Sequence, residues 1–268
     1  MRSVLFTPIL LLLFTCSVNK PVKRETPSFN RILDSFKLKG SILVYDHNNR
    51  IYYSNDFKWA EEGNLPASTF KIPNSIIALE TGVIKDDSTM TKWDGQPRRL
   101  KVWEQDLQFK DAFSVSCVPC YQEIAREIGT ERMNSWLSKL SYPGMVVNDS
   151  TIDHFWLEGN SRISQMQQVD FLERFYFSRL PISERSTTIV KQIMQVEKTD
   201  TYVLSGKTGW GIRNGGNNAW FVGYLETQDN VYFFATNVIP SEGFDLANFT
   251  TARMEVTKAA LKDQGWLD

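Results

Sequence analysis

The stretch NLPASTFKIPNS, residues 64–75, places Lys71 three residues after Ser68 in otherwise apolar surroundings. The spacing of apolar residues that follows predicts a helix over residues 68–80. Residues three apart share one face of a helix, so the serine hydroxyl and the lysine amine would be neighbours. A serine becomes a nucleophile when a nearby base takes its proton, and a lysine can be that base only while it is neutral. The pair therefore raises the hypothesis of a serine nucleophile.

Taken alone, an S-x-x-K pair is weak evidence for a catalytic site. The same spacing recurs at Ser17 and Lys20, a serine commonly caps a helix, and a lysine usually faces solvent. Two further stretches strengthen the hypothesis. Residues 205–211, SGKTGWG, place Lys207 on a predicted strand, and residues 116–118, Ser-Cys-Val, begin a predicted helix. Each stretch has an ordinary structural explanation, but all three together in this order indicate one catalytic site.

The order of predicted elements favours an α+β fold. Two strands, residues 41–46 and 51–56, flank the turn HNN, and a long helical region follows. Three strands then come at residues 201–207, 218–226 and 231–239, and an amphipathic helix over residues 247–265 ends the chain. We expect one antiparallel sheet flanked by helices, with a helical lobe at about residues 68–195 inserted into it, in a single domain over residues 21–268.

Composition excludes several classes of function. The 268 residues are 42% hydrophobic, and 30 basic and 31 acidic residues give a net charge of −1, so no nucleic-acid surface is expected. The sequence has two histidines, His47 and His154. This scarcity argues against a zinc hydrolase and leaves few candidates for the base of a Ser-His-Asp triad, so we expect no metal.

The first 20 residues have the pattern of an export signal. Arg2 precedes an apolar run over residues 4–14, which is too short for a stable membrane span. Cys16 closes the run, and LFTC partly matches a lipoprotein cleavage site. Two alternatives stay open: plain release as a periplasmic or secreted protein, and attachment to the outer membrane through a lipidated Cys16.

Cys117 and Cys120 form a C-x-x-C pair in an exported chain, where a disulfide is permitted. No second cluster of Cys or His completes a zinc site. We expect two buried free thiols, which pack as small apolar groups. A disulfide is the alternative that we favour less, because a helical backbone would strain so short a loop.

These motifs together resemble the class D, oxacillin-hydrolysing serine β-lactamases over essentially the whole mature chain. The segments that carry the resemblance are PASTFKIPNS, SCVP with YQEIAREIG, FWLEG, LSGKTG, WFVGYLE and ARMEVTKAAL, beginning at residues 66, 116, 121, 155, 204, 220 and 252. S-x-x-K and K-T-G alone are shared with penicillin-binding proteins. The resemblance implies the fold common to both groups, and a β-lactam substrate.

The resemblance also implies roles for individual residues. Ser68 would attack the β-lactam carbonyl, and Lys71 would be the general base. In this family the lysine is carboxylated by carbon dioxide to N6-carboxylysine, and no other cofactor is implied. Val118 and Trp156 would enclose that lysine, and the indole N–H would hold the carbamate.

The other implied roles concern the oxyanion, the leaving nitrogen and the substrate carboxylate. The backbone N–H groups of Ser68 and Trp210 would bind the oxyanion. Ser116 would relay a proton to the leaving nitrogen, beside Lys207. The substrate carboxylate would bind Thr208 and Arg253, and Gly209 would let the substrate approach the strand.

One departure and several rival functions qualify this interpretation. The usual Tyr-Gly-Asn is replaced by Tyr142-Pro143-Gly144, so only a wall role for Tyr142 is carried over. The rivals are a DD-peptidase or transpeptidase, a β-lactam sensor domain that is acylated without turnover, and a non-catalytic exported binding protein. A further alternative for the base is Glu158 acting through a water. The oligomeric state and the preferred β-lactams stay open.

Overall fold

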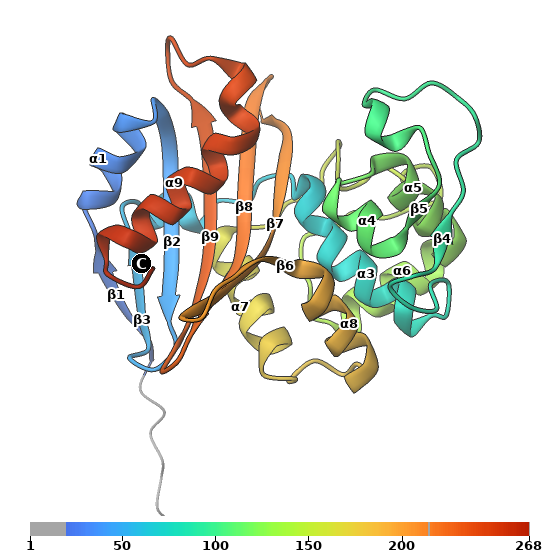
Figure 1. Ribbon diagram of the computed structural model, residues 1–268, viewed down its shortest axis with the longest axis horizontal. Helices are drawn as coiled ribbons and strands as arrows, with labels where there is room; N and C mark the ends of the chain where they lie inside the picture. The colour runs from blue at the N-terminus through green and yellow to red at the C-terminus, as the bar shows by residue number, and fades with distance from the viewer. Residues whose placement is uncertain (1–19, 214, 268) are drawn as a thin grey trace, which may run out of the picture.

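The computed structural model describes residues 20–213 and 215–267 (Figure 1). Apart from Lys20, the predicted export segment with Cys16 lies outside these residues. Among the described residues, no helix is long and apolar enough to cross a membrane.

A seven-stranded sheet forms one half of the molecule, with strands from both ends of the chain (Figure 1). In the order β1-β3-β2-β9-β8-β7-β6, the central pairing joins β2 to β9. The strands are β1 (Val22–Glu25), β2 (Leu38–Asp46), β3 (Ile51–Ser54), β6 (Gln195–Lys198), β7 (Tyr202–Arg213), β8 (Gly216–Thr227) and β9 (Val231–Pro240). All neighbours are antiparallel except β1, which runs parallel to β3 at the edge. The predicted sheet is confirmed, with two edge strands that the sequence pattern did not indicate.

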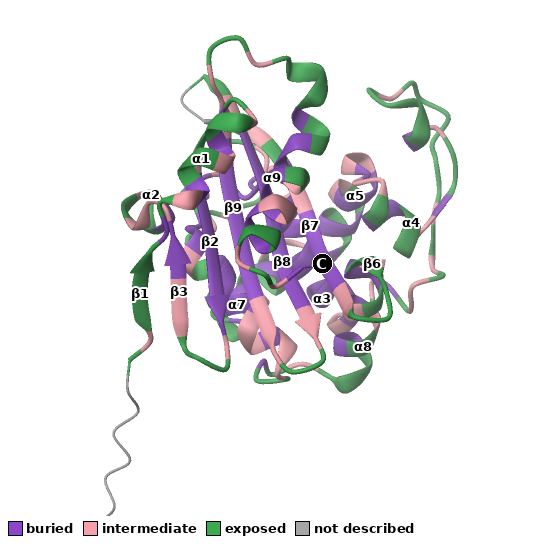
Figure 2. Cartoon of the chain, turned by 60° about the vertical axis from the view of Figure 1, so that its left-hand side comes forward, coloured by how far each residue is buried: buried purple, intermediate pink, exposed green. Residues whose placement is uncertain are grey.

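Alternating residues of the central strands bury themselves on opposite faces of the sheet. Along β2, Ile42 and Val44 belong to one apolar cluster, whereas Leu43 and Tyr45 belong to the other. Successive side chains of a strand point to opposite faces, so a strand with helices on both sides is apolar throughout. The first cluster packs under α1 (Ser28–Ser35) and α9 (Phe249–Asp263). Figure 2 shows the resulting burial along the middle of the sheet.

Helices dominate the chain between β3 and β6, and several of them lie beyond the β7 side of the sheet (Figure 1). They are α2 (Phe57–Glu61), α3 (Lys71–Glu80), α4 (Phe109–Ser114), α5 (Val118–Ile128), α6 (Thr130–Lys139), α7 (Gln165–Tyr176) and α8 (Glu184–Met194). Short elements connect them: the 3₁₀ turns η1 (Ala67–Phe70) and η2 (Lys101–Trp103), and the pair β4 (Met90–Thr91) and β5 (Leu107–Gln108). A third 3₁₀ turn, η3 (Leu246–Asn248), precedes α9.

The helix predicted over residues 68–80 begins differently from the prediction. Residues 67–70 form η1, and the α-helix starts at Lys71. Ala67 has a positive φ of 48°, and the Thr69 amide donates to the Pro66 carbonyl at 3.2 Å, one residue closer than in an α-helix. Ser68 therefore lies on a tight turn at the entry to α3.

Candidate active site

Ser68 and Lys71 lie side by side at the junction of η1 and α3. Lys71 Nζ donates to Ser68 Oγ at 3.3 Å. A backbone hydrogen bond fixes the turn to the segment around Trp156, because the Ala67 amide donates to the Trp156 carbonyl at 2.8 Å. A side-chain hydrogen bond fixes the turn to α7, because Gln168 Nε2 donates to Thr69 Oγ1 at 2.9 Å. These bonds fix the serine relative to the lysine.

Lys71 is fully buried, and its amine faces an apolar and aromatic environment. Its Nζ lies 4.8 Å from the centroid of the Tyr121 ring. The Tyr121 hydroxyl is hydrogen-bonded to Ser75 Oγ at 2.8 Å. Burial lowers the pKa of Lys71 to about 7, because a charged amine loses its hydration there. At neutral pH a large fraction of this lysine is therefore unprotonated and able to accept a proton.

Strand β7 passes directly against η1. A Cβ added at Gly209 would lie 3.1 Å from the Pro66 carbonyl oxygen and 3.2 Å from Thr69 Cγ2. A side chain there would push the strand away from the turn that carries Ser68. Strand β6 pairs with β7 only as far as Ser205, so from Gly206 onward no strand in the described part of the chain pairs with that edge of β7. The approach of β7 to η1 is thus set by a glycine.

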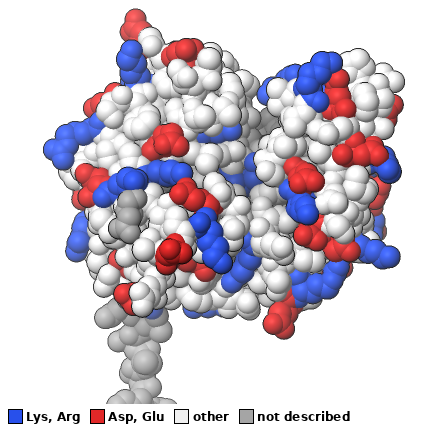
Figure 3. Space-filling view, viewed as in Figure 1, with Lys and Arg blue, Asp and Glu red and all other residues white. Residues whose placement is uncertain are grey.

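Three buried basic side chains, those of Lys71, Lys207 and Arg253, gather around this junction. Burial lowers the pKa of Lys207, and the charges of Lys71 and Arg253 lower it further. Burial also lowers the pKa of Arg253 to about 10, which leaves it charged at neutral pH. Arg253 Nη1 donates to the Gly209 carbonyl at 2.8 Å, so α9 is joined to β7. Figure 3 shows Lys and Arg atoms in the hollow between the two halves of the molecule. Such a site favours an anionic ligand.

Ser116 lies between α4 and α5, in the left-handed region with a φ of 55°. Its amide donates to the Phe113 carbonyl at 3.1 Å, and the Trp103 indole donates to the Val115 carbonyl at 3.0 Å. The ring of Phe113 lies 5.6 Å from Lys207 Nζ, which links the Ser116 turn to β7. Val118 is half-buried at the first position of α5.

Cys117 and Cys120 form a disulfide, so the expectation of two free thiols was wrong. That expectation assumed a helical backbone at both cysteines. Cys117 instead lies at the N-cap of α5, with φ −56° and ψ 106°, and only Cys120 is within the helix. The non-helical cap brings the two Cα atoms to 5.4 Å, within the range that disulfides span.

Trp156 is fully buried and stacks on Phe70, with ring centroids 5.6 Å apart. Its Nε1 has no hydrogen-bond partner among the described residues. A buried indole N–H normally finds an acceptor. The remaining predicted residues lie along β7: Thr208 is half-buried, and Trp210 is 36% exposed with its Nε1 donating to Asn217 Oδ1 at 2.9 Å.

Comparison with known proteins identifies this arrangement. The family model of the penicillin binding protein transpeptidase domain matches residues 39–262. Beta-lactamase OXA-48 of Klebsiella pneumoniae is 40% identical over 243 residues, which are 90% of this chain and 89% of that protein. The chain belongs to the class D serine β-lactamases.

Two further proteins are similar to this class D enzyme over most of its chain. The crystal structure of a class D β-lactamase from Nostoc is 44% identical, with a TM-score of 0.85 over 89% of this chain and 99% of that one. The regulatory protein BlaR1 of Bacillus licheniformis is 34% identical over 216 residues, which are 80% of this chain but 35% of that protein. The predicted fold class, a helix-flanked sheet of the penicillin-binding-protein type, is confirmed.

The segment Tyr142-Pro143-Gly144 of this class D enzyme does not form a wall of the catalytic site through Tyr142. Tyr142 is buried, its ring packs edge-on against Phe70 at 6.0 Å, and its hydroxyl donates to Gln168 Oε1 at 3.3 Å. It therefore supports η1 from within the core, and the wall role expected for it was wrong.

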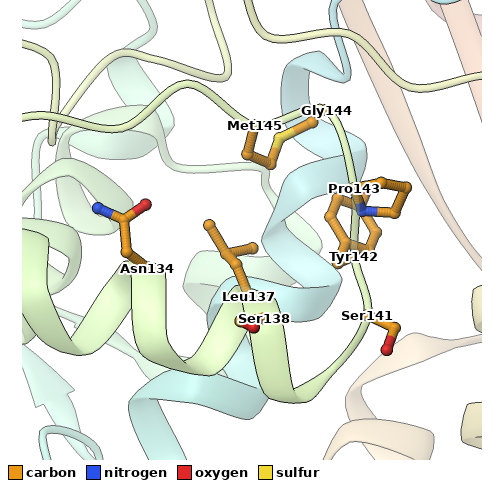
Figure 4. A pocket seen from close by; sticks show the side chains of 8 residues that line it. All are labelled: Asn134, Leu137, Ser138, Ser141, Tyr142, Pro143, Gly144 and Met145. Carbon is orange, nitrogen blue, oxygen red and sulfur yellow. The ribbon is translucent and has the colours of Figure 1, made fainter.

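The same segment lines a separate pocket of about 330 Å³ beside α6 (Figure 4). In Figure 4, Leu137 and Met145 project into the space between the helix and the loop. Gly144 has a positive φ of 77°, and a Cβ there would collide with the Arg162 carbonyl. None of the predicted catalytic residues lines this pocket.

Sequence reasoning missed the residues that hold the catalytic pair of the class D enzyme in place. Gln168 lies outside every motif, and Tyr121 opens the segment YQEIAREIG, from which no role for the tyrosine was inferred. Ser75 could have been noted, because it lies four residues after Lys71 and so shares its helix face. Among residues 20–213 and 215–267, no group of three or more His, Cys, Asp or Glu is arranged to hold a metal ion.

Proposed function

We propose that this class D β-lactamase opens the β-lactam ring through an acyl-enzyme on Ser68, with Lys71 carboxylated by carbon dioxide as the general base. The observation that carries the proposal is the buried pair, with Lys71 Nζ 3.3 Å from Ser68 Oγ. The amine has lost its hydration, and its pKa is lowered to about 7. A nucleophile beside a base that is neutral at working pH meets the requirement for covalent catalysis.

The residues around Lys71 fit a carbamate. Carbon dioxide reacts with a neutral amine, and the lowered pKa provides one at neutral pH. The unpartnered Trp156 Nε1 offers a donor in a fully buried position. A carbamate would supply an anionic oxygen base within the apolar enclosure. Its charge would also offset the buried guanidinium of Arg253 and favour the protonated form of Lys207.

Backbone groups of η1 and β7 are the candidates for binding the oxyanion. The Ser68 amide lies on η1, and the Trp210 amide follows Gly209, where the two elements are in contact. Preformed donors of this kind typically contribute ~3 kcal/mol to the stabilisation of the transition state. Ser116 and Lys207 would pass the proton to the leaving nitrogen.

Arg253, with Thr208, would bind the carboxylate next to the β-lactam ring. Arg253 is buried and anchored by one nitrogen to the Gly209 carbonyl, while its Nε has no partner among the described residues. An anchored guanidinium keeps further donors for a carboxylate. Val118 and Trp156 would keep water from the lysine.

Turnover separates this proposal from its rivals. A sensor domain or a transpeptidase would also be acylated at Ser68, but would release product slowly. The higher identity to a β-lactamase, 40% against 34% to a regulatory protein, favours the enzyme. We further propose that the chain is exported, acts in the periplasm or after secretion, and confers β-lactam resistance on its host.

The deciding experiment follows hydrolysis of a chromogenic cephalosporin at sub-stoichiometric enzyme, with and without bicarbonate in carbon-dioxide-depleted buffer. We expect many turnovers per enzyme, and a fall in rate on depletion that bicarbonate reverses. One turnover or fewer would support a sensor or transpeptidase. Full activity without carbon dioxide would show that the Lys71 amine itself is the base.

A further inference from the structure

Asn74 on α3 is the second polar side chain near Lys71 that has no partner. It is fully buried, and neither Oδ1 nor Nδ2 has a hydrogen-bond partner among the described residues. Two other buried asparagines satisfy each other: Asn218 Nδ2 donates to Asn237 Oδ1 at 3.1 Å, and Asn237 Nδ2 donates to Asn218 Oδ1 at 3.0 Å. A buried amide with both atoms unsatisfied loses its hydration without compensation. Its presence therefore points to a polar group that binds there.

Helix spacing places Asn74 on the flank of α3 that also carries Phe70. Asn74 follows Lys71 by three residues and Phe70 by four, so it shares a helix face with both. Phe70 has helical backbone angles, φ −60° and ψ −18°, so the spacing extends back to it. The Phe70 ring stacks on Trp156. Asn74 thus lies on the flank of α3 that turns towards Trp156.

On the opposite flank of α3, the buried Ser75 hydroxyl has hydrogen-bond partners. Ser75, four residues after Lys71, donates to the Lys71 carbonyl at 2.6 Å and is bonded to the Tyr121 hydroxyl at 2.8 Å. The unsatisfied atoms of α3 and of the aromatic rings stacked on it are therefore confined to one side of Lys71. They comprise the Trp156 indole N–H, which is a donor, and the Asn74 amide, which is both a donor and an acceptor.

We propose that Asn74 is a positioning residue that donates its side-chain amide to a carbamate on Lys71, together with Trp156; this rests on the proposed function. In the carboxylation, the amine lone pair forms an N–C bond to carbon dioxide, and one N–H proton leaves to solvent. The product carries one negative charge on two oxygens. Two neutral donors at that flank satisfy both oxygens without adding charge, whereas an acidic side chain there would repel the group.

The test compares Asn74→Leu and Asn74→Asp with the parent enzyme in two measurements besides activity. The first is the ¹³C NMR signal of the carbamate, titrated with ¹³C-bicarbonate at fixed pH. We expect Asn74→Leu to weaken apparent bicarbonate affinity at least tenfold and Asn74→Asp to abolish the signal. Wild-type affinity in Asn74→Leu would overturn the proposal.

The second measurement is the melting temperature with and without bicarbonate. Without bicarbonate, Asn74→Leu should melt at or above the parent temperature, because an unsatisfied amide has been removed. With bicarbonate, the parent should gain stability and the variant should not. A purely structural role would lower the melting temperature equally in both conditions, which would contradict the proposal.

Asn218→Leu is the matched control, because it removes an asparagine that is buried and paired. It should lower the melting temperature in both conditions and leave bicarbonate affinity unchanged. If Asn74→Leu does not fold, Asn74→Ser is measured instead, with Asn218→Ser as its control. Asn74→Ser should weaken bicarbonate affinity, and Asn218→Ser should leave it unchanged. Absence of a carbamate signal in the parent enzyme would instead refute the proposed function, and this inference with it.

Discussion

The Nζ atom of Lys71 lies 3.3 Å from the Oγ atom of Ser68, and the lysine is completely buried. Because the amine is enclosed and has no carboxylate partner among the described ion pairs, burial alone lowers its pKa to about 7. The same burial that makes Lys71 a base costs stability whenever the amine is charged.

Replacing Ser68 with Ala should abolish hydrolysis and leave the fold intact. The side chain lost is small, and the hydrogen bonds that hold η1 involve the Ala67 backbone and the Thr69 hydroxyl. Turnover should fall at least ~10⁴-fold, as expected for loss of a nucleophile. Circular dichroism checks the fold. A folded Ser68→Ala protein that keeps substantial turnover would refute the assignment of the nucleophile.

Lys71→Met should stabilise the protein at low pH. The pKa of Lys71 is about 7 in the folded state against an ordinary value of 10.5, so the unfolded state binds more protons between these values. The free energy of unfolding of the parent should therefore rise with pH across that window, by about 2–3 kcal/mol between pH 6 and pH 9 from this group.

Because a methionine side chain does not titrate, the advantage of the Lys71→Met variant over the parent should be largest at pH 6 and smallest at pH 9. Denaturant unfolding of both proteins in carbon-dioxide-depleted buffer measures this difference. A difference in unfolding free energy that is the same at both pH values would show that Lys71 is not the titrating group.

Glu158→Gln should leave most of the activity. The Glu158 side chain is 72% exposed, and one of its carboxylate oxygens lies 3.6 Å from His154 Nε2. An exposed carboxylate of this kind does not enclose a water beside Ser68. We expect kcat within about twofold of the parent. Accumulation of acyl-enzyme in the variant by mass spectrometry, together with no response to bicarbonate, would instead favour Glu158 as the base.

Reducing the Cys117–Cys120 disulfide should lower activity modestly. The bridge joins the N-cap of α5 to its first turn, next to the strained Ser116. Its closed loop is very short, so the stability gain should be below the ~3 kcal/mol expected for a 15-residue loop. The double variant Cys117→Ala/Cys120→Ala should show a several-fold lower kcat and a small fall in melting temperature. An unchanged kcat in the double variant would show that the disulfide does not position Ser116 for catalysis.

Gly209→Ala should reduce kcat strongly, whereas Gly211→Ala should not. An added Cβ at Gly209 meets the Pro66 carbonyl at 3.1 Å, so β7 must move away from η1. At Gly211 the nearest atom is Ala67 Cβ at 3.4 Å, which is an ordinary contact. We expect kcat to fall about 10- to 100-fold in Gly209→Ala, on the scale of removing one oxyanion donor. In Gly211→Ala it should fall less than about threefold. Equal effects would argue against a role for this contact.

The sequence by itself determined the framework of this protein. Apolar runs bounded by turn residues indicated the central strands, and helical spacing indicated most helices, since burial of a strand or of a helix face leaves a direct pattern in the residues. The motifs around Ser68, Ser116 and Lys207 indicated the family. The exposed edge strand β1, with the residues Val-Lys-Arg-Glu, left no such pattern, because its four side chains bury nothing.

Only the tertiary structure decided the properties that make the site reactive. A side chain's burial and its hydrogen-bond partners depend on segments far apart in the chain, which no local pattern records. The lowered pKa of Lys71 comes from packing against Tyr121, and the unpartnered atoms of Trp156 and Asn74 are recognised only once every neighbour is placed. The disulfide likewise depended on the non-helical backbone of Cys117, which the sequence pattern assigned to a helix.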